Sequence, residues 1–128
     1  MTINDAEIVA EVTAVFERYE AALIANDTAV LDELFLTEPT TVRYGIGESL
    51  YGIKAIREFR TSRPAVGLVR RLAQTQITTY GRDCAVAATL FYRDAAPDKV
   101  GRQMQTWVRT SDGWRVAAAH VSIIDEPK

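Results

Sequence analysis

Two strands joined by a tight turn constrain the fold of this 128-residue chain more than any other segment. Residues 106–122, TWVRTSDGWRVAAAHVS, contain two runs of alternating apolar residues. An Asp-Gly dipeptide at 112–113 separates them, and this combination is a strong signal for a β-hairpin. Strict alternation predicts that Trp114, His120 and Ser122 share one face of the second strand. Because His120 is the only histidine, we expect this face to form the floor of a pocket.

The rest of the chain reads as a helical front half followed by a strand-rich back half, without a linker. This order predicts a single α+β domain over residues 1–128. Helices are expected at 3–25, 28–35 and 53–63. Strands are expected at 40–44, 68–80, 84–93, 100–110 and 114–124, with a loop or hairpin at 45–52. The long antiparallel strands should curve around the helices and leave an open cone beside the first helix.

Composition excludes several classes of function. A formal net charge of −2 argues against a nucleic-acid-binding protein, which usually needs a basic face. The chain has no apolar run long enough to span a membrane, and its acidic N-terminus does not resemble a signal peptide, so we expect a cytoplasmic protein. One cysteine, Cys84, and one histidine are too few for an ordinary zinc site, and no Gly-rich phosphate loop is present. We therefore predict that the protein needs no metal and no cofactor.

Tyr19 is a candidate site residue on the first helix. It falls on an apolar stripe at helical spacing, between Phe16 and Leu23. One interpretation is a core tyrosine whose hydroxyl binds a backbone carbonyl. The other is a phenol that donates a proton or hydrogen bond to a substrate in the cone.

Arg43 is a candidate on the first short strand, 40–44. An inward-facing arginine needs an anionic partner, and its planar fork suits a carboxylate. The partner is either an acid of the protein, such as Glu20 or Glu48, or a ligand. Tyr44 points the opposite way on a straight strand, so both residues can line a pocket only if the strand twists or bulges near Gly45.

The last strands supply further candidates. His120 is either a base or carboxylate-binding donor, or a structural histidine bonded to the backbone, and Ser122 is a possible partner for it. No nucleophile-elbow motif surrounds Ser122, which argues against a hydrolytic triad. On the preceding strand Gln103, Gln105 and Trp107 share one face, and periodicity does not say whether that face looks into the cone.

Arginines recur at three-residue intervals in the third helix. Arg57 and Arg60 are expected to be solvated, whereas Arg63 ends the helix before a proline and should reach the mouth of the cone. The adjacent Arg70 and Arg71 are expected to be exposed.

Several longer segments resemble a known family. They are FERYEAAL, TVRYGIGESLYG, FRTSRPAVGL, TTYGRD, GRQMQTWVR and GWRVAAAHVS. With the long first helix, they resemble the AtzH-like family of the NTF2-like (SnoaL-like) superfamily, and within it the branch of the oxalurate-catabolism protein HpxZ. The resemblance implies an NTF2-like cone, in which a strongly curved, mostly antiparallel sheet wraps around three helices.

The resemblance also implies an activity. In the AtzH branch, 1,3-dicarboxyurea is hydrolysed to allophanate, and a first-helix tyrosine and a first-strand arginine carry the reaction. These correspond here to Tyr19 and Arg43. The implied protein is a cofactor-free amidohydrolase of nitrogen catabolism that acts on a small carboxylated urea or an oxalurate-related dicarboxylate. Two alternatives remain: a binding or accessory protein for a pathway amidase, and a ketosteroid-type isomerase, which ranks last because no inward carboxylate base is identifiable on the strands.

A homodimer is implied by the resemblance and favoured by the predicted sheet. A curved sheet covered by helices on one side leaves its outer face partly apolar, and such faces often form interfaces. We expect this face to include Val121, Ile123 and either Val108 or Trp107.

Overall fold

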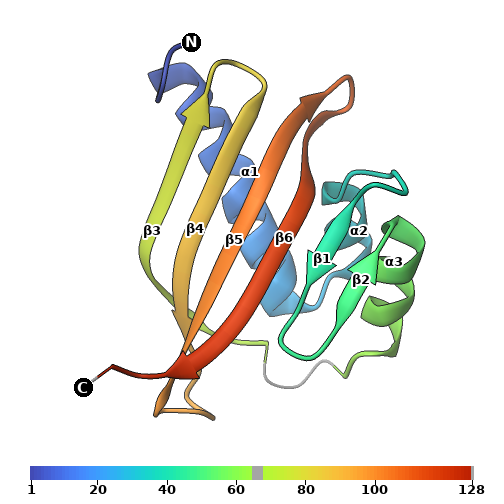
Figure 1. The fold of residues 1–128 in the computed structure, drawn as a ribbon, viewed down its shortest axis with the longest axis vertical. Helices are drawn as coiled ribbons and strands as arrows, with labels where there is room; N and C mark the ends of the chain where they lie inside the picture. The colour runs from blue at the N-terminus through green and yellow to red at the C-terminus, as the bar shows by residue number, and fades with distance from the viewer. Residues whose placement is uncertain (65–67, 128) are drawn as a thin grey trace.

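The computed structural model describes residues 1–64 and 68–127 and forms an α+β cone, as the sequence predicts (Figure 1). The front half contains three helices and two short strands. The helices are α1 (Ala6–Ala25), α2 (Thr28–Leu34) and α3 (Ile53–Ser62). The strands are β1 (Val42–Tyr44), β2 (Ser49–Tyr51), β3 (Arg71–Tyr80), β4 (Cys84–Tyr92), β5 (Lys99–Thr110) and β6 (Gly113–Asp125).

The strands form one curved sheet in the order β2-β1-β6-β5-β4-β3. Neighbours are antiparallel except β1 and β6, which run parallel. Helix α1 crosses one face of the long strands, while α2 and α3 lie beside the short β1–β2 hairpin (Figure 1). The β1–β2 hairpin therefore extends the sheet beyond β6, with α3 beside it (Figure 1).

Helix α1 forms for the reasons its sequence suggests. The side chain of Asp5 caps the helix by accepting a hydrogen bond from the Glu7 backbone, and Asn26 ends the helix in a left-handed conformation. The buried stripe begins at Ile8, and the neighbouring Val9 is half-buried. The members of the stripe are Ile8, Val12, Phe16, Tyr19, Ala22 and Leu23.

A bulge in β6 changes the face that its side chains occupy. Trp107 pairs with Val116, but the neighbouring Thr106 pairs with Ala118, so Ala117 is an extra residue in the ladder. Before the bulge Trp114 and Val116 face the core, and after it Ala119 does. The prediction that Trp114 and His120 share a face is therefore wrong, because strict alternation fails at one residue.

Glu11 joins α1 to the last hairpin and makes stability depend on pH. Its carboxylate accepts hydrogen bonds from Arg109 Nη1 (2.7 Å) and Trp114 Nε1 (3.0 Å). These bonds hold the pKa of Glu11 below its usual value of 4.5, and the bond from Arg109 has the larger effect. A carboxyl whose pKa is lowered by folding stabilises the protein above the unfolded pKa, and this contribution is lost as the pH falls through the folded pKa.

We therefore expect Glu11→Gln to lower the melting temperature at pH 7, and the difference from wild type to shrink below pH 4.5, where Glu11 of the unfolded chain is protonated. Thermal melts from pH 7 to pH 3 measure this. A difference that stays constant over this range would contradict the assignment.

Candidate functional site

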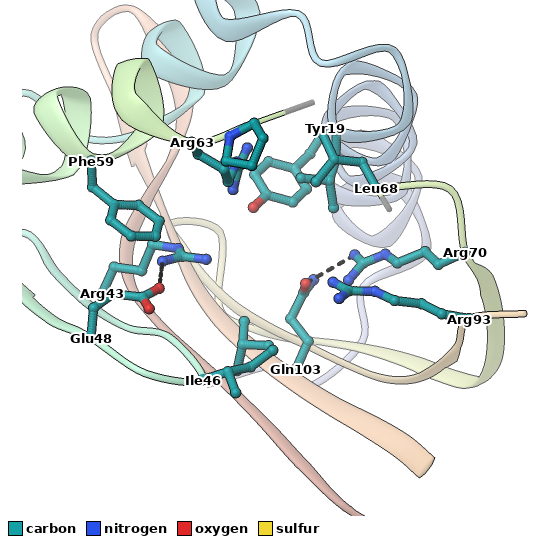
Figure 2. A pocket seen from close by; sticks show the side chains of 13 residues that line it. Tyr19, Arg43, Ile46, Glu48, Phe59, Arg63, Leu68, Arg70, Arg93 and Gln103 are labelled. Carbon is teal, nitrogen blue, oxygen red and sulfur yellow. Dashed lines mark hydrogen bonds and ion pairs between the residues drawn. The ribbon is translucent and has the colours of Figure 1, made fainter. Parts of the chain in front are cut away.

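A cavity of about 230 Å³ opens on the concave side of the sheet. Its walls come from α1, the β1–β2 hairpin, the end of α3, the chain just before β3 and after β4, and the inner face of β5 and β6 (Figure 2). The volume is below the ~300–1,000 Å³ typical of sites for drug-sized ligands, so the cavity suits a smaller molecule.

Tyr19 places a phenol in this cavity. Its side chain is 5 % exposed, and its ring packs edge-on against Trp107 and at a tilt against Phe35, with centroid distances of 6.4 and 6.2 Å. The hydroxyl points into the cavity (Figure 2). Two buried aromatic rings thus fix the direction of a group that can donate a proton or a hydrogen bond.

Arg43 projects into the cavity from β1 and forms an ion pair with Glu48 of the hairpin. The distance from Nη1 to the Glu48 carboxylate is 2.8 Å. Gly45 provides the room for this pair, because a Cβ there would lie 1.7 Å from Glu48 Oε1 and 2.9 Å from Arg43 Nη1. The guanidinium also lies over the Phe59 ring, 5.6 Å from its centroid. The ion pair and the ring hold the Arg43 fork at one end of the cavity.

Arg63 lies near Arg43 and Tyr19, as expected from its place at the end of α3 (Figure 2). Its Nε and Nη2 are buried, and within residues 1–64 and 68–127 they have no hydrogen-bond partner. Burial lowers the pKa of the Arg63 guanidinium, and the neighbouring charge of Arg43 lowers it further. A cation that is disfavoured in this way gains from an anion placed beside it.

Arg70 and Arg93 reach the cavity from the opposite side (Figure 2). Arg70 binds both carboxylate oxygens of Glu20, at 2.9 and 2.6 Å, and donates to Gln103 Oε1 at 2.9 Å. Arg93 forms no ion pair with any residue in the described part of the chain, and burial, followed by the charge of Arg70, lowers its pKa.

The expectation that Arg70 and Arg60 are exposed is wrong. Arg70 is buried because Glu20 neutralises it and its guanidinium stacks on the Phe91 ring, 4.6 Å from the centroid. Arg60 is 4 % exposed because Asp32 and the Phe35 ring hold it against the core. Arg71, in contrast, is exposed as expected.

Three predicted site residues lie on the outer face of the sheet, away from the cavity. His120 and Tyr44 meet on the outer face of the sheet, where their rings contact edge-on at a centroid distance of 6.0 Å. Ser122 accepts a hydrogen bond from Arg102 there. The bulge in β6 turns His120 and Ser122 outward and Val121 inward, so Val121 lines the cavity. Tyr44 points outward because β1 alternates regularly, with Arg43 inward.

The face of β5 that carries Gln103, Gln105 and Trp107 is the one that looks into the cone. Gln103, Gln105 and Trp107 are all buried on the inner face, and Met104 is 56 % exposed on the other. Of the three, Gln103 lines the cavity. Trp107 supports Tyr19, and its Nε1 donates to Gln105 Oε1 at 3.1 Å. Gln105 and Trp107 therefore lie behind the cavity wall.

The outer face of the sheet differs from the one expected for a dimer. Val121 and Trp107 face inward. The outer face carries instead Val42, Tyr44, Val86, Met104, Thr106, Ala118 and His120. Dimerisation remains a prediction, with these residues in place of Val121 and Trp107.

Positive charge dominates the cavity. Four arginines line it, Arg43, Arg63, Arg70 and Arg93. Glu48 and Glu20 neutralise Arg43 and Arg70. The guanidinium groups of Arg63 and Arg93 thus have no acidic partner among the residues described. With the Tyr19 phenol beside them, the site can bind an anion and donate a proton to it. Alternation left open whether Gln103 faces the cone, and no motif marks Arg93, because the placement of both side chains depends on contacts between strands.

The described residues contain no group of three or more His, Cys, Asp or Glu side chains that could hold a metal ion. Among the helices of the described chain, none has the length and hydropathy needed to cross a lipid bilayer.

Comparison with known proteins identifies relatives over nearly the full length. A family model described as AtzH-like matches residues 1–127. A protein of unknown function from the DUF3225 family of Pectobacterium atrosepticum is 58% identical, with 96% of this chain and 95% of that chain covered and a TM-score of 0.94. A cystatin-like fold protein from Burkholderia xenovorans LB400 is 47% identical, with 99% of each chain covered and a TM-score of 0.95.

A more distant structure establishes the broader fold. An NTF2-like superfamily protein from Salmonella enterica serovar Typhimurium is 24% identical, covers 96% of this chain and 94% of its own, and has a TM-score of 0.72. No match was found among curated proteins. The cone is thus an NTF2-like fold, and the chain belongs to the AtzH-like family.

Proposed function

We propose that the protein is a hydrolase that cleaves a C–N bond of a small carboxylated urea in this cavity. The observation that carries the proposal is the phenol of Tyr19, directed at the space between arginines of which two lack an acidic partner among the described residues. Family membership supports it, because the resemblance implies hydrolysis of 1,3-dicarboxyurea to allophanate.

Each residue has a role in this proposal. Arg43, together with Arg63, binds one terminal carboxylate of the substrate. Tyr19 donates a proton to the nitrogen as the bond from that nitrogen to the terminal carboxylate carbon breaks. Water adds to the carboxylate carbon, which leaves as bicarbonate, and a proton returns to the phenol from solvent.

Charge favours a doubly charged substrate over a singly charged one. A carboxylated urea with two terminal carboxylates supplies two negative charges for the two unmatched guanidinium groups. Oxalurate carries one carboxylate and would leave one of them without a counter-charge. An oxalurate-related ligand of the HpxZ branch is therefore our second candidate, favoured by the sequence segments rather than by the charge of the cavity.

The other classes of function fit the cavity less well. An isomerase of the ketosteroid type needs a free carboxylate as its base, and the lining carboxylate of Glu48 is held by Arg43. A protein that only binds the anion, as an accessory to a pathway amidase, would use the same arginines. It would differ in having no need for the Tyr19 hydroxyl.

Turnover of a ¹³C-labelled carboxylated urea, followed by ¹³C NMR, tests the proposal. We expect the wild-type protein to release bicarbonate and Arg43→Lys to raise KM, because lysine keeps the charge but loses the fork that binds a carboxylate with two hydrogen bonds. A rise in KM of about tenfold corresponds to ~1.4 kcal/mol of lost binding free energy. Arg43→Ala should lose more.

Arg57→Lys is the matched control, because Arg57 lies on the exposed side of α3, where it contacts Thr37. Equal KM values for wild type and Arg43→Ala would contradict the assignment of Arg43. Binding of the urea without turnover would instead support a binding protein.

A further inference from the structure

The end of the cavity opposite Arg43 contains hydrogen-bond donors without acceptors. Gln103 is 2 % exposed, and its Oε1 accepts from Arg70, which leaves its Nε2 free to donate. That Nε2 and the Nε of Arg93 are buried, and neither has a partner within the described part of the chain. Both side chains line the cavity, and Gln103 points toward Arg70 and Arg93 (Figure 2).

Buried donors in folded proteins are almost always paired. Here a guanidinium and an amide lie at one end of a cavity, unpaired by described residues, so this end suits an anionic group that can accept their hydrogen bonds. Arg70 is already occupied by Glu20 and Gln103, whereas Arg93 has its charge available. Burial and the charge of Arg70 lower the pKa of Arg93, because both disfavour its charged form. A bound anion would favour that charged form.

We propose that Arg93 and Gln103 bind the second carboxylate of the ligand and thereby set its length and charge. This assignment rests on the anion-binding cavity of the proposed function and adds the residues that distinguish a dicarboxylate from a monocarboxylate. Arg43 and Arg63 hold the first carboxylate beside Tyr19, and Arg93 with Gln103 holds the other, across the cavity (Figure 2).

Phe91 keeps this second end in place. Its ring is 1 % exposed and lies under both guanidinium groups, 4.6 Å from Arg70 and 5.2 Å from Arg93. Phe91 pairs with Gly101 of β5, and a Cβ at Gly101 would lie 2.0 Å from the ring. Glycine at 101 therefore lets the ring lie flat across β5, where it supports the two arginines.

Glutarate and pentanoate are suitable probes. Glutarate carries two carboxylates separated by three atoms, as in 1,3-dicarboxyurea, and it has no C–N bond to hydrolyse. Pentanoate has the same carbon chain and one carboxylate. NMR titration of the protein with each acid gives two dissociation constants, and their ratio measures the contribution of the second carboxylate.

We expect wild type to prefer glutarate, and Arg93→Gln to reduce the preference by about 10–100-fold, the effect of losing a charge-assisted hydrogen bond. Gln103→Leu should reduce it by less, because a neutral donor is lost. Arg93→Lys should restore part of it. Arg71→Gln is the matched control, because Arg71 is exposed and stacks on Tyr92 outside the cavity; it should keep the wild-type ratio.

An unchanged ratio in Arg93→Gln, with wild-type melting temperature and glutarate still bound in the cavity, would overturn this assignment and leave the proposed hydrolysis standing. If glutarate preference depends on Arg93 but no carboxylated urea is turned over, the assignment holds and the proposed hydrolysis fails. If wild type does not prefer glutarate to pentanoate, the assignment is also wrong.

Discussion

Tyr19→Phe is expected to lower kcat for a carboxylated urea by about 10²–10⁴-fold, the usual contribution of a positioned proton donor. The ring remains packed against Trp107 and Phe35, so the cavity keeps its shape. The hydroxyl points into the cavity, so its removal should leave the free energy of unfolding nearly unchanged (Figure 2). Steady-state kinetics and thermal melts of the same preparation measure the two effects.

The opposite pattern would show that Tyr19 is a structural residue. In that case Tyr19→Phe would lose about 1 kcal/mol of stability through a broken hydrogen bond and would keep its turnover. Tyr80→Phe is the matched control, since Tyr80 ends β3 with 37% of its surface exposed and does not line the cavity. It should change neither kcat nor melting temperature.

Trp107→Ala is expected to cost about 3–5 kcal/mol of stability, as for other large-to-small changes at buried aromatic residues. Trp107 is fully buried at the centre of the sheet, where it contacts Tyr19 and donates to Gln105. Its removal leaves a void beneath the Tyr19 ring. Urea denaturation measures the change in the free energy of unfolding.

Tyr51→Ala provides the comparison for Trp107→Ala. Tyr51 is 64% exposed on β2 and contacts Tyr44. Loss of such a cross-strand contact costs roughly 1 kcal/mol or less. Equal losses in the two variants would contradict the assignment of Trp107 to the core that supports the site.

The sequence predicted most of the fold because local patterns determine it. Helical spacing located α1, and the Asp-Gly turn located the β5–β6 hairpin within one residue. The pairing of β1 with β6 is a contact between segments more than 70 residues apart, which no local pattern encodes. The short strand predicted at 40–44 is present as β1 (Val42–Tyr44), but its pairing with β6 was not predicted.

The expected direction of a candidate side chain agrees with the structure where it follows from regular periodicity, and differs from it where the periodicity is broken. Tyr19, Arg43 and Arg63 come together in the cavity. The single extra residue in β6 moved His120 and Ser122 to the outer face, and alternation carries no sign of it. A bulge depends on how the chain packs against β5, so only the three-dimensional structure reveals it.

The arginines show a second limit of sequence reasoning. Arginine is a residue type that usually lies at the surface, yet Arg70 is buried because Glu20, fifty positions earlier, pairs with it. Arg93 follows a strand with no distinguishing motif. The burial of a charge depends on distant partners, and these are set by the tertiary fold.

A crystal structure with glutarate bound tests the central claim most directly. We predict that the ligand lies in the cavity, with one carboxylate within hydrogen-bond distance of Arg43 and Arg63 and of the Tyr19 hydroxyl. Glutarate bound elsewhere on the protein, or a Tyr19 hydroxyl that is bonded to a backbone carbonyl and does not touch the ligand, would contradict the account.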